Sequence, residues 1–572
     1  MNPRLQRTIR RIAGRADPEG ENAAALDTGC LDVARALCRE GAYVLLTTPL
    51  SPEMDVLEFG AGCGTRTRFL AERVRHVTAL DEDADALAIA ALRNREKTNV
   101  EYLPGAYAQV LSRLPAERRF DLAVFVDEEP AAELLAAVRE RLAPGGEVLI
   151  ACDNPCGVKH WPAADQPAGD CGARLKELRG RLAAAGFAPP HVAYPYPDHR
   201  FPLFVYTDDS LPAPGYCYFN TFPWDPVPPA FDATALWNRL IAEKRFPEAA
   251  NSYLLHARPV SSAAPGEGTD GGALLPSYTK ICAIRDGSLR ICTSIFRRRD
   301  GTRYVEKKPL EAAAAAHVAA LARWDRDLSA LYAGTPLRVN RGEPARDAYR
   351  LEFLDAPTLY GEIIAAIRRD DTAEALRQMA GVFSLLRAAA TEPFVPTEEF
   401  SARFGARPMP EGMLSAPVTD IDVNFDNFFL TPAGGMTLVD YEFTYDFPVP
   451  VDFTVFRALH YLFRRNPWIV ERHGAFVQEA WRLAGIDRAR FRLFAAMERS
   501  FQLRVHGPSD ALYFFRPFPQ TGWRAVVRRL LPRRLRARIR RLLPRRLRAV
   551  WLRLASARGG KKDERLSYAP VE

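Results

Sequence analysis

A glycine-rich stretch near the start of the chain is the first candidate for chemistry. The sequence VLEFGAGCGTRTRFL, residues 56–70, places Gly60, Gly62 and Gly64 after an apolar run and before a helical pattern. Glycines let a backbone approach a ligand closely, and the N-terminus of the next helix supplies N–H donors. The following apolar run ends in Asp81, where a carboxylate can accept the hydroxyls of a ribose. A plain tight turn also uses glycines, but the added acid favours a nucleoside-type cofactor.

The elements that would position this loop form an α/β pattern. Apolar runs alternate with helical patterns from Met54 to about Thr207, which predicts a parallel sheet of Rossmann-like type. The last two runs are joined by PYPDHRFP with no helix between them, so we expect them to pair antiparallel. A further helix is expected over 233–255. The expected strands are Asp55–Phe59, His76–Leu80, Val100–Leu103, Leu122–Val126, Glu147–Cys152, His191–Tyr194 and Leu203–Thr207.

The spacing Glu-x-Gly-x-Gly-x-Gly resembles the first motif of class I S-adenosylmethionine-dependent methyltransferases. FDLAVFV, which leads into Asp127, is similar to their fourth strand, and RLAPGGEVLIA is similar to their next helix, turn and fifth strand. The resemblance implies a seven-stranded Rossmann-like domain with S-adenosylmethionine as cofactor. Many relatives have an acid after strand three for the adenine, where this chain has Gly105 and Ala106. The cofactor residues implied by the resemblance are Glu58, Gly60, Ala61, Gly62, Gly64 and Asp81.

The acceptor of a methyl group is expected outside the carboxyl ends of the strands. Transfer from a sulfonium depends mainly on positioning, and a base matters only if the nucleophile is a hydroxyl. Each polar residue there could equally be a solvated loop residue. The residues at this edge are Asp127, Glu128, Glu129, Asp153, Asn154, Lys159 and His160, of which Asp127, Glu128, Asn154, Lys159 and His160 are predicted to be catalytic.

A finer resemblance concerns the acceptor. The stretches DNPCGVKHW and YPYPDHRFPLFVYTDDSLP resemble the region after strand five in bacterial methyltransferases of cell-surface polysaccharide clusters. In many of those proteins a kinase-like domain follows a segment similar to RFPEAANSYLL. The resemblance implies a glycan or lipid-linked saccharide as the acceptor.

A second pattern begins near residue 276. DVNFDN places Asp422 five residues before Asn427, and TLVDYEF ends an expected strand in Asp440. This pattern resembles aminoglycoside-phosphotransferase-like kinases, which implies an α+β domain that binds ATP and Mg²⁺. The resemblance implies Asp422 as the base with Asp420 as a competitor, Asn427 and Asp440 as metal ligands, and Lys307 or else Lys308 on the phosphates. The histidine and glycine that precede the base in relatives are absent, so an inert acid-rich domain is the alternative.

The basic charge of the chain is local. The formal net charge is +8, and thirteen arginines lie between Arg524 and Arg553, so the rest of the chain is mildly acidic. Leucines recur among these arginines at helical intervals, which predicts that Trp523–Leu554 is amphipathic and binds an anionic membrane surface. Nucleic acid is the rival partner, but the leucines argue against it. A soluble helix that folds onto the acidic body is the third reading.

These observations predict an organisation and a function. Nine cysteines without paired spacing and the lack of an apolar spanning run indicate a cytoplasmic protein, peripheral on the inner membrane face. The expected function is methylation of a surface or lipid-linked polysaccharide, with the second domain phosphorylating the same acceptor and a glycosyltransferase as a further partner. The alternatives are methylation of a small molecule or protein beside an inert second domain, and a non-catalytic membrane scaffold. The expected parts are a helical lead-in (1–50), the methyltransferase (51–210), a helix and linker (211–275), the kinase-like domain (276–510) and the basic tail (511–572).

Overall fold

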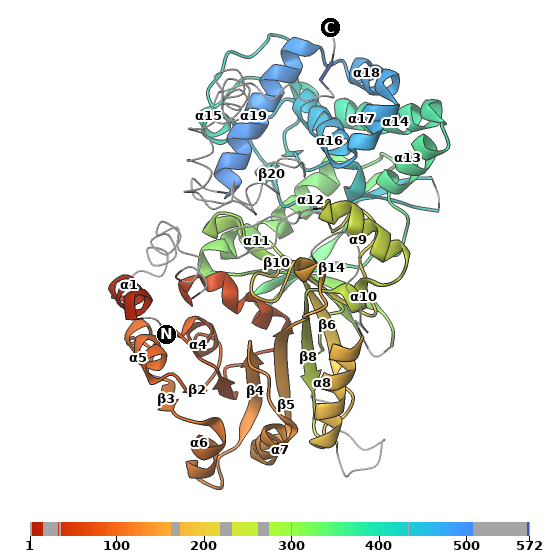
Figure 1. Ribbon diagram of the computed structural model, residues 1–572. Coiled ribbons are helices and arrows are strands. Elements are labelled where there is room, and N and C mark those ends of the chain that lie inside the picture. The colour runs from red at the N-terminus through yellow and green to blue at the C-terminus, as the bar shows by residue number, and fades with distance from the viewer. Residues whose placement is uncertain are drawn as a thin grey trace, which may run out of the picture. The chain divides into compact units, whose positions relative to one another are not determined.

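The computed structural model describes residues 3–14, 33, 36–161, 172–217, 231–260, 274–298, 300–432, 434–506 and 569–570. The chain divides into two compact units (Figure 1). Among the described residues, unit 1 comprises those up to Ala283 and those between Ser294 and Thr302, and unit 2 comprises Ile284–Thr293, those from Arg303 to His506, and 569–570. No helix among the described residues is long and apolar enough to span a membrane. The predicted membrane-binding segment Trp523–Leu554 lies outside the described residues.

Unit 1 is built on a mixed sheet with the strand order β3-β2-β1-β4-β5-β8-β6-β7-β9. The strands β3, β2, β1, β4 and β5 pair in parallel, as the alternation of apolar runs and helices predicts. β4 is buried along almost its whole length, which is typical of a strand covered by helices on both faces. The strands are β1 Asp55–Phe59, β2 His76–Asp81, β3 Val100–Pro104, β4 Phe120–Val126, β5 Leu142–Asp153, β6 His191–Tyr196, β7 Phe204–Thr207, β8 Ser252–Ala257 and β9 Tyr278–Ile281.

Helices surround this sheet (Figure 1). α1 packs on α5, while α6 packs on α7 and α7 on α8. Asp83 caps α5, because its Oδ1 accepts the backbone N–H groups of Asp85 and Ala86 at 3.0 Å. The helices are α1 Pro3–Ala13, η1 Arg39–Thr47, α4 Thr65–Ala71, α5 Ala84–Arg93, α6 Tyr107–Arg113, α7 Ala132–Arg141, η2 Val158–His160, α8 Ala173–Ala184, α9 Ala233–Ala242 and α10 Phe246–Ala249.

The helix expected over 233–255 begins at Ala233 as predicted, but its predicted extent beyond Ala242 is wrong. α9 ends at Ala242, Lys244 adopts a φ of +58°, and Pro247 stands at the start of the short α10. A left-handed residue and a proline break the helix although the apolar spacing continues. The fully buried strand β8 follows and lies between β5 and β6, antiparallel to both. The predicted antiparallel pairing of the two later strands is confirmed, because β7 pairs with β6 in that sense.

The register brings three loops to one edge of the sheet. Phe59 at the end of β1 pairs with Phe125 of β4, and Val126 pairs with Ala151 of β5. The segments after β1, β4 and β5 therefore leave the sheet side by side at its carboxyl edge. Ligands of open α/β sheets bind in such a crevice.

Unit 2 combines antiparallel strands with many helices. β11 pairs antiparallel with β14. The strand expected before Asp440 is present as β19, which pairs antiparallel with β18. The strands of unit 2 include β11 Arg303–Pro309, β12 Leu337–Val339, β13 Gly342–Ala345, β14 Ala348–Glu352, β18 Phe428–Leu430 and β19 Met436–Leu438, and β10 Ile291–Arg297 contributes residues to both units. Its longer helices are α12 Leu321–Leu331, α13 Leu359–Arg368, α14 Thr372–Ala389, α16 Val451–Arg465, α18 Gly474–Leu483 and α19 Arg488–His506.

Candidate functional site

The glycine loop links β1 to α4 and turns through left-handed backbone. Gly60, Gly62 and Gly64 have φ values of +68°, +55° and +80°. Residues with a Cβ rarely adopt such values, so the turn itself requires glycine at these positions. Ala61 between them is buried, and its N–H donates to the carbonyl of Leu80 at 3.0 Å. Ala61 thus ties the loop to β2, and its predicted cofactor contact can come only from its backbone.

The three glycines have different neighbours. A Cβ on Gly64 would lie 2.7 Å from the Cβ of Ala90 on α5, so this glycine allows α5 to approach the loop. A Cβ on Gly60 would lie 2.6 Å from Cγ of Glu128. A Cβ on Gly62 would meet nothing nearer than a backbone oxygen at 4.0 Å. Gly62 is therefore the one of the three whose missing side chain faces open space.

α5 holds the loop from behind. The side chain of Asn94, just after α5, donates to the carbonyl of Gly64 at 3.0 Å. Arg93 is 4% exposed and donates to Thr65 Oγ1 at 2.9 Å and to the carbonyl of Leu37 at 3.1 Å. A small apolar cluster that includes Ile9, Cys63 and Ile89 packs α1 against the same place. The loop is thus fixed by packing rather than left to move.

Asp81 lies at the end of β2 and faces the loop. Its Oδ2 accepts the N–H of Gly62 at 2.7 Å, and its Oδ1 accepts the N–H of Asp83 at 2.7 Å. Each carboxylate oxygen keeps a further lone pair, so the group can still accept hydrogen bonds from a diol. The glycine loop and this acid therefore lie side by side, and binding of a ribose by Asp81 stays a prediction.

Glu58 and Arg66 form a buried pair beside the loop. Glu58 is 0% exposed and accepts a hydrogen bond from Thr67 Oγ1 at 2.7 Å. Its Oε1 and Arg66 Nε stand 3.9 Å apart, and each is buried without a hydrogen bond to the described residues. Burial raises the pKa of Glu58 to about 6, although Arg66 and Thr67 oppose the rise. An unpaired acceptor next to an unpaired donor fits the ammonium and carboxylate of an α-amino acid.

Glu128, predicted to be catalytic, lies over Gly60. Tyr107 at the start of α6 bonds to its carboxyl and packs edge-on against Phe59. Burial raises the pKa of Glu128, and the charge of Asp81 adds to the rise. A ligand that reaches Gly60 must therefore contact this carboxyl or turn it aside.

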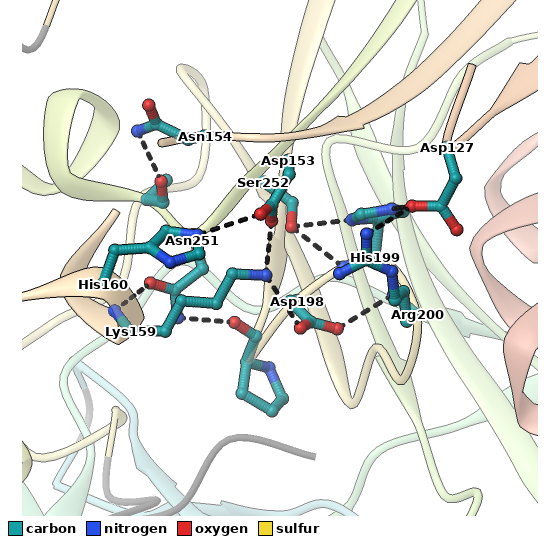
Figure 2. A network of polar contacts seen from close by, with 12 residues as sticks. Asp127, Asp153, Asn154, Lys159, His160, Asp198, His199, Arg200, Asn251 and Ser252 are labelled. Atoms are coloured by element: carbon teal, nitrogen blue, oxygen red, sulfur yellow. Dashed lines mark hydrogen bonds and ion pairs between the residues drawn. The ribbon is translucent and has the colours of Figure 1, made fainter. Parts of the chain in front are cut away.

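Asp127, the first residue after β4, is held by two side chains from the hairpin between β6 and β7. Its Oδ1 accepts from His199 Nε2 at 2.7 Å and lies 2.7 Å from a guanidinium nitrogen of Arg200 (Figure 2). Its φ is +63°, a strained value for a residue with a side chain. Burial opposes ionisation, but His199 and Arg200 hold the pKa of Asp127 well below its ordinary value. The carboxylate is therefore charged at neutral pH, with 36% of its side chain exposed.

His199 is held in a fixed orientation. It is fully buried, and its Nδ1 lies 2.8 Å from Oγ of Ser252, which also accepts the N–H of His199 at 3.2 Å. Its Nε2 faces the carboxylate of Asp127. Ser252 is 0% exposed. It thus orients His199 and is not available as a nucleophile.

A second group of charges follows β5. Lys159 Nζ forms ion pairs with Asp153 and, at 3.1 Å, with Asp198, and only 8% of its side chain is exposed. His160 Nε2 lies 2.9 Å from Asp153 Oδ2, and 42% of the His160 side chain is exposed (Figure 2). Burial acts against ionisation, but His160 and Lys159 keep the pKa of Asp153 well below its ordinary value.

Asn154 has structural contacts. It is 0% exposed and donates to the carbonyls of Glu248 at 3.0 Å and Ala250 at 2.7 Å, while its Oδ1 accepts from Cys156 N–H at 3.1 Å. These bonds fasten the segment after β5 to the one before β8. The fully buried amide of Asn154 shows only structural contacts in this structure. Its catalytic role stays a prediction.

The sequence analysis identifies only about half of the residues in this network. Asp127, Lys159 and His160 were predicted, and the structure brings them to one edge with Asp153. The hairpin sequence PYPDHRFP supports the strand pairing and the family resemblance, but no site role is predicted for its charged residues, although their presence was a signal. The residues that were not singled out are Asp198, His199, Arg200, Asn251 and Ser252, and the last two belong to the segment that was wrongly expected to be helical.

Unit 2 has its own cluster of charges. Lys307 on β11 donates to Asp440, and its Nζ lies 3.5 Å from Glu442. Arg285 contacts the same Glu442 at 2.6 Å. Burial opposes ionisation, but the two cations keep the pKa of Glu442 well below its ordinary value. Lys307 is buried whereas 47% of the Lys308 side chain is exposed, so Lys307 is the lysine that faces the cluster.

Asp420 and Asp422 lie close together near this cluster. The N–H of Asp422 donates to Asp420 at 2.9 Å, and Arg457 contacts Asp422 at 3.1 Å. Burial raises the pKa of both carboxyls, and the charge of Asp422 raises that of Asp420 further. Asn427 donates its amide to the backbone carbonyl of Asp422 at 2.6 Å. The predicted metal ligands Asn427 and Asp440 are thus engaged by protein groups, and the described residues contain no group of three or more His, Cys, Asp or Glu side chains that could hold a metal ion.

Comparison with known proteins identifies one part of the chain. Residues 56–146 match the model of a family described as a methyltransferase domain. The match runs from β1 into β5 and includes the glycine loop, Asp81 and Asp127. This part of unit 1 is therefore similar to a methyltransferase domain. A search of curated proteins gave no match.

Solved structures similar to the chain cover parts of it. A precorrin-8w decarboxylase from Methanobacterium thermoautotrophicum is 20% identical over 26% of this chain and 71% of its own, with a TM-score of 0.20. Phosphoethanolamine N-methyltransferase 1 from Haemonchus contortus is 14% identical over 46% of this chain and 50% of its own, with a TM-score of 0.26. An rRNA methylase from Streptococcus thermophilus is 15% identical over 38% of this chain and 93% of its own, with a TM-score of 0.22.

Proposed function

We propose that unit 1 transfers a methyl group from S-adenosylmethionine to a cell-surface or lipid-linked polysaccharide. The match of residues 56–146 to a methyltransferase domain supports the reaction. The observation that carries the choice of donor is the pair of unpaired buried atoms, Glu58 Oε1 and Arg66 Nε, next to a glycine loop and Asp81. Together these groups match the amino-acid and ribose parts of one molecule.

In this proposal, each residue binds a different part of the donor. Glu58 accepts its ammonium group, Arg66 donates to its carboxylate, and Asp81 accepts the ribose hydroxyls. S-adenosylmethionine supplies an activated methyl group on a positively charged sulfonium. Asp127 and Glu128 place negative charge beside that cation, and Gly62 offers the open backbone it can approach.

Binding of the donor is tested by calorimetry with S-adenosylmethionine and with S-adenosylhomocysteine. Asp81→Ala should weaken binding at least about tenfold, because the diol loses a charged acceptor worth roughly 1.5–3 kcal/mol. Asp55→Ala is the matched control, since Asp55 begins β1 at the opposite edge and pairs with Arg75. Unchanged affinity in a folded Asp81→Ala protein would contradict the site.

The saccharide acceptor rests on the resemblance of DNPCGVKHW and the PYPDHRFP hairpin to enzymes of polysaccharide clusters. Mass spectrometry of surface polysaccharide from cells with and without the protein tests it. A methyl group that disappears with the protein supports a glycan acceptor. An unchanged glycan would favour the alternative, methylation of a small molecule or a protein.

Unit 2 is a second candidate activity. We propose that it phosphorylates the same acceptor, using Lys307 for the phosphates of ATP and Asp422 as the base. The observation that favours this is the buried lysine that contacts both Asp440 and Glu442. For Mg²⁺ to bind there, Asp440 must leave Lys307. Calorimetry with ATP and Mg²⁺ tests the activity, and no binding would favour an inert second unit.

We further propose that Trp523–Leu554 holds the protein on the inner face of the membrane, close to a lipid-linked acceptor and to a glycosyltransferase. The support is the composition of that segment, in which arginines alternate with leucines. If the protein binds neither S-adenosylmethionine nor ATP, a non-catalytic scaffold on the membrane becomes the better explanation.

A further inference from the structure

The acceptor edge of unit 1 is rich in carboxylates whose neighbouring cations are already paired. Arg200 contacts Asp127 at 2.7 Å, and Lys159 is bound between Asp153 and Asp198. Arg66, which is assigned above to the carboxylate of the donor, donates to the carbonyl of Gly60 at 2.6 Å. Among the described residues of this edge, Arg200 and Lys159 therefore each have a carboxylate partner.

This charge arrangement favours a neutral acceptor group over an anionic one. A phosphate would approach Asp127 and Glu128 as a like charge, and each cation it recruited would leave a carboxylate behind. Like charges in a partly buried site cost several kcal/mol, so a phosphate is strongly disfavoured. A neutral hydroxyl meets no such penalty, and it can donate a hydrogen bond to the fixed carboxylate of Asp127.

A hydroxyl nucleophile needs a base, and the same edge provides one. The ionised carboxylate of Asp153 accepts the Nε2–H of His160 at 2.9 Å, which leaves the lone pair on Nδ1. Nδ1 makes no hydrogen bond to the described residues, and 42% of the imidazole is exposed. Lys159 contacts the same Asp153 and, like His160, favours its charged form. Asp127 is a poorer base, because His199 and Arg200 lower the pKa of its carboxyl and so weaken its tendency to take up a proton.

We propose that the acceptor of the methyltransferase is an uncharged hydroxyl group and that His160, oriented by Asp153, is its general base. The proposal rests on the function assigned to unit 1 above. His160 Nδ1 takes the hydroxyl proton while the oxygen forms a bond to the methyl carbon. The carbon–sulfur bond breaks and its electron pair stays on sulfur, which becomes a neutral thioether. The imidazolium then returns its proton to water.

The product identifies the acceptor atom. The full-length protein is incubated with S-adenosyl-[methyl-¹⁴C]methionine and the lipid and polysaccharide fraction of cells that express it. Aqueous hydrofluoric acid cleaves phosphate esters but leaves methyl ethers intact. Label that stays on a monosaccharide after this treatment supports a hydroxyl acceptor. Label released as methanol, or lost in mild alkali as from a carboxyl ester, overturns it. The complete absence of label contradicts the proposed function itself.

Variants test the base. His160→Gln should lower kcat at least about 100-fold, because general base catalysis contributes roughly 10²–10⁴. The affinity for S-adenosylhomocysteine should not change. His76→Gln is the control, because His76 begins β2 at the opposite edge of the sheet. An His160→Gln enzyme with the kcat of the wild type would overturn the proposal.

Two further measurements separate a base from a structural histidine. His160→Gly should regain activity with added imidazole, and absence of rescue in a protein that still binds S-adenosylhomocysteine would contradict the base. The charged groups around His160 are Asp153 and Lys159, with Asp198 and Arg200 behind them. Asp153→Asn removes the carboxylate that orients the imidazole, so kcat should fall at least about tenfold while KM for the donor stays unchanged. A kcat equal to that of the wild type would exclude Asp153 as the positioning residue.

Discussion

Two carboxylates of the methyltransferase domain have opposite electrostatic environments. Glu58 is buried beside one guanidinium, and burial raises its pKa to about 6. Asp127 is partly exposed, and His199 and Arg200 keep its pKa well below the ordinary value. Glu58 can therefore change charge when a cation binds, whereas Asp127 offers a constant charge. This difference supports the proposal that Glu58 binds the donor and that Asp127 orients the acceptor.

Donor affinity should depend on pH through Glu58. The ammonium of the donor binds the ionised carboxylate, so affinity for S-adenosylhomocysteine should rise as pH increases through about 6 and then level off. Glu58→Gln keeps the shape and an acceptor for Thr67, so its affinity should be about tenfold or more lower and nearly independent of pH. Calorimetry from pH 5 to pH 8 measures both. A parallel pH dependence in the variant would exclude Glu58.

The stability of the free protein should show the reverse trend. Because the folded-state pKa of Glu58 is raised from 4.5 to about 6, its contribution to stability is present at low pH and is lost as pH rises through about 6. Glu58→Gln should flatten this part of the curve of unfolding free energy against pH. Denaturant titrations of both proteins at several pH values give the comparison.

Asp127→Asn should destabilise unit 1 by about 1–2 kcal/mol at neutral pH. The amide can still accept from His199, but Arg200 loses its charged partner, and the partial exposure of the pair limits the effect. The pKa of Asp127 is lowered from 3.8, so its stabilisation is present above that pH and is lost as pH falls below it. The wild type and the variant should therefore converge in acid, as thermal unfolding scans can show. Equal stability at neutral pH would mean that the pair contributes nothing.

At the scale of elements, the glycine loop both packs against α5 at Gly64 and leaves space for a ligand at Gly62, and substitutions can separate the two effects. A methyl group at Gly64 would collide with Ala90 on α5, so Gly64→Ala adds a clash to the left-handed strain. Gly62→Ala adds only the strain of a left-handed backbone, about 1–2 kcal/mol, because a Cβ at this position would face open space. We expect Gly64→Ala to lower the melting temperature more, and Gly62→Ala to lose donor affinity while it stays folded. Thermal unfolding and calorimetry on the two proteins decide this, and the opposite order would place the ligand elsewhere.

The parallel half of the sheet was predictable because its strands are buried runs separated by helices. β1 has the bounds that the sequence predicts, and β2 and β3 differ from the prediction by one residue at one end. β8 was not predictable, since SYLLHA continues the helical spacing of α9, and only a left-handed Lys244 and the tertiary pairing with β5 decide otherwise. The contacts of His199, Ser252 and Asp127 depend on that strand. They come from segments about 50 and 70 residues apart, and no local pattern reports such contacts.

At the scale of the whole molecule, the chemistry of each unit can be tested through its own ligand. Lys307→Met removes the cation that contacts Asp440 and leaves Glu442 with Arg285 as its cationic partner, which should destabilise unit 2 by about 3 kcal/mol. Lys308→Met is a matched control, because the neighbouring lysine is exposed. If unit 2 binds nucleotide through Lys307, ATP with Mg²⁺ should stabilise the wild type and Lys308→Met but not Lys307→Met in thermal scans. Stabilisation of all three proteins would exclude Lys307 as the phosphate ligand.

The basic segment should decide where the whole protein resides. Thirteen arginines change the sign of the net charge, and each contributes about 1 kcal/mol of attraction to a membrane that contains acidic lipid. The full chain should therefore sediment with vesicles of phosphatidylglycerol and phosphatidylcholine, and a chain that ends at Gly522 should stay in the supernatant. Binding should fall as the salt concentration is raised, while the hydrophobic contribution of the leucines to binding should persist at high salt. Equal binding to vesicles of phosphatidylcholine alone would show that charge is not the cause, and retention of the shortened chain would show that another surface of the protein binds the lipid.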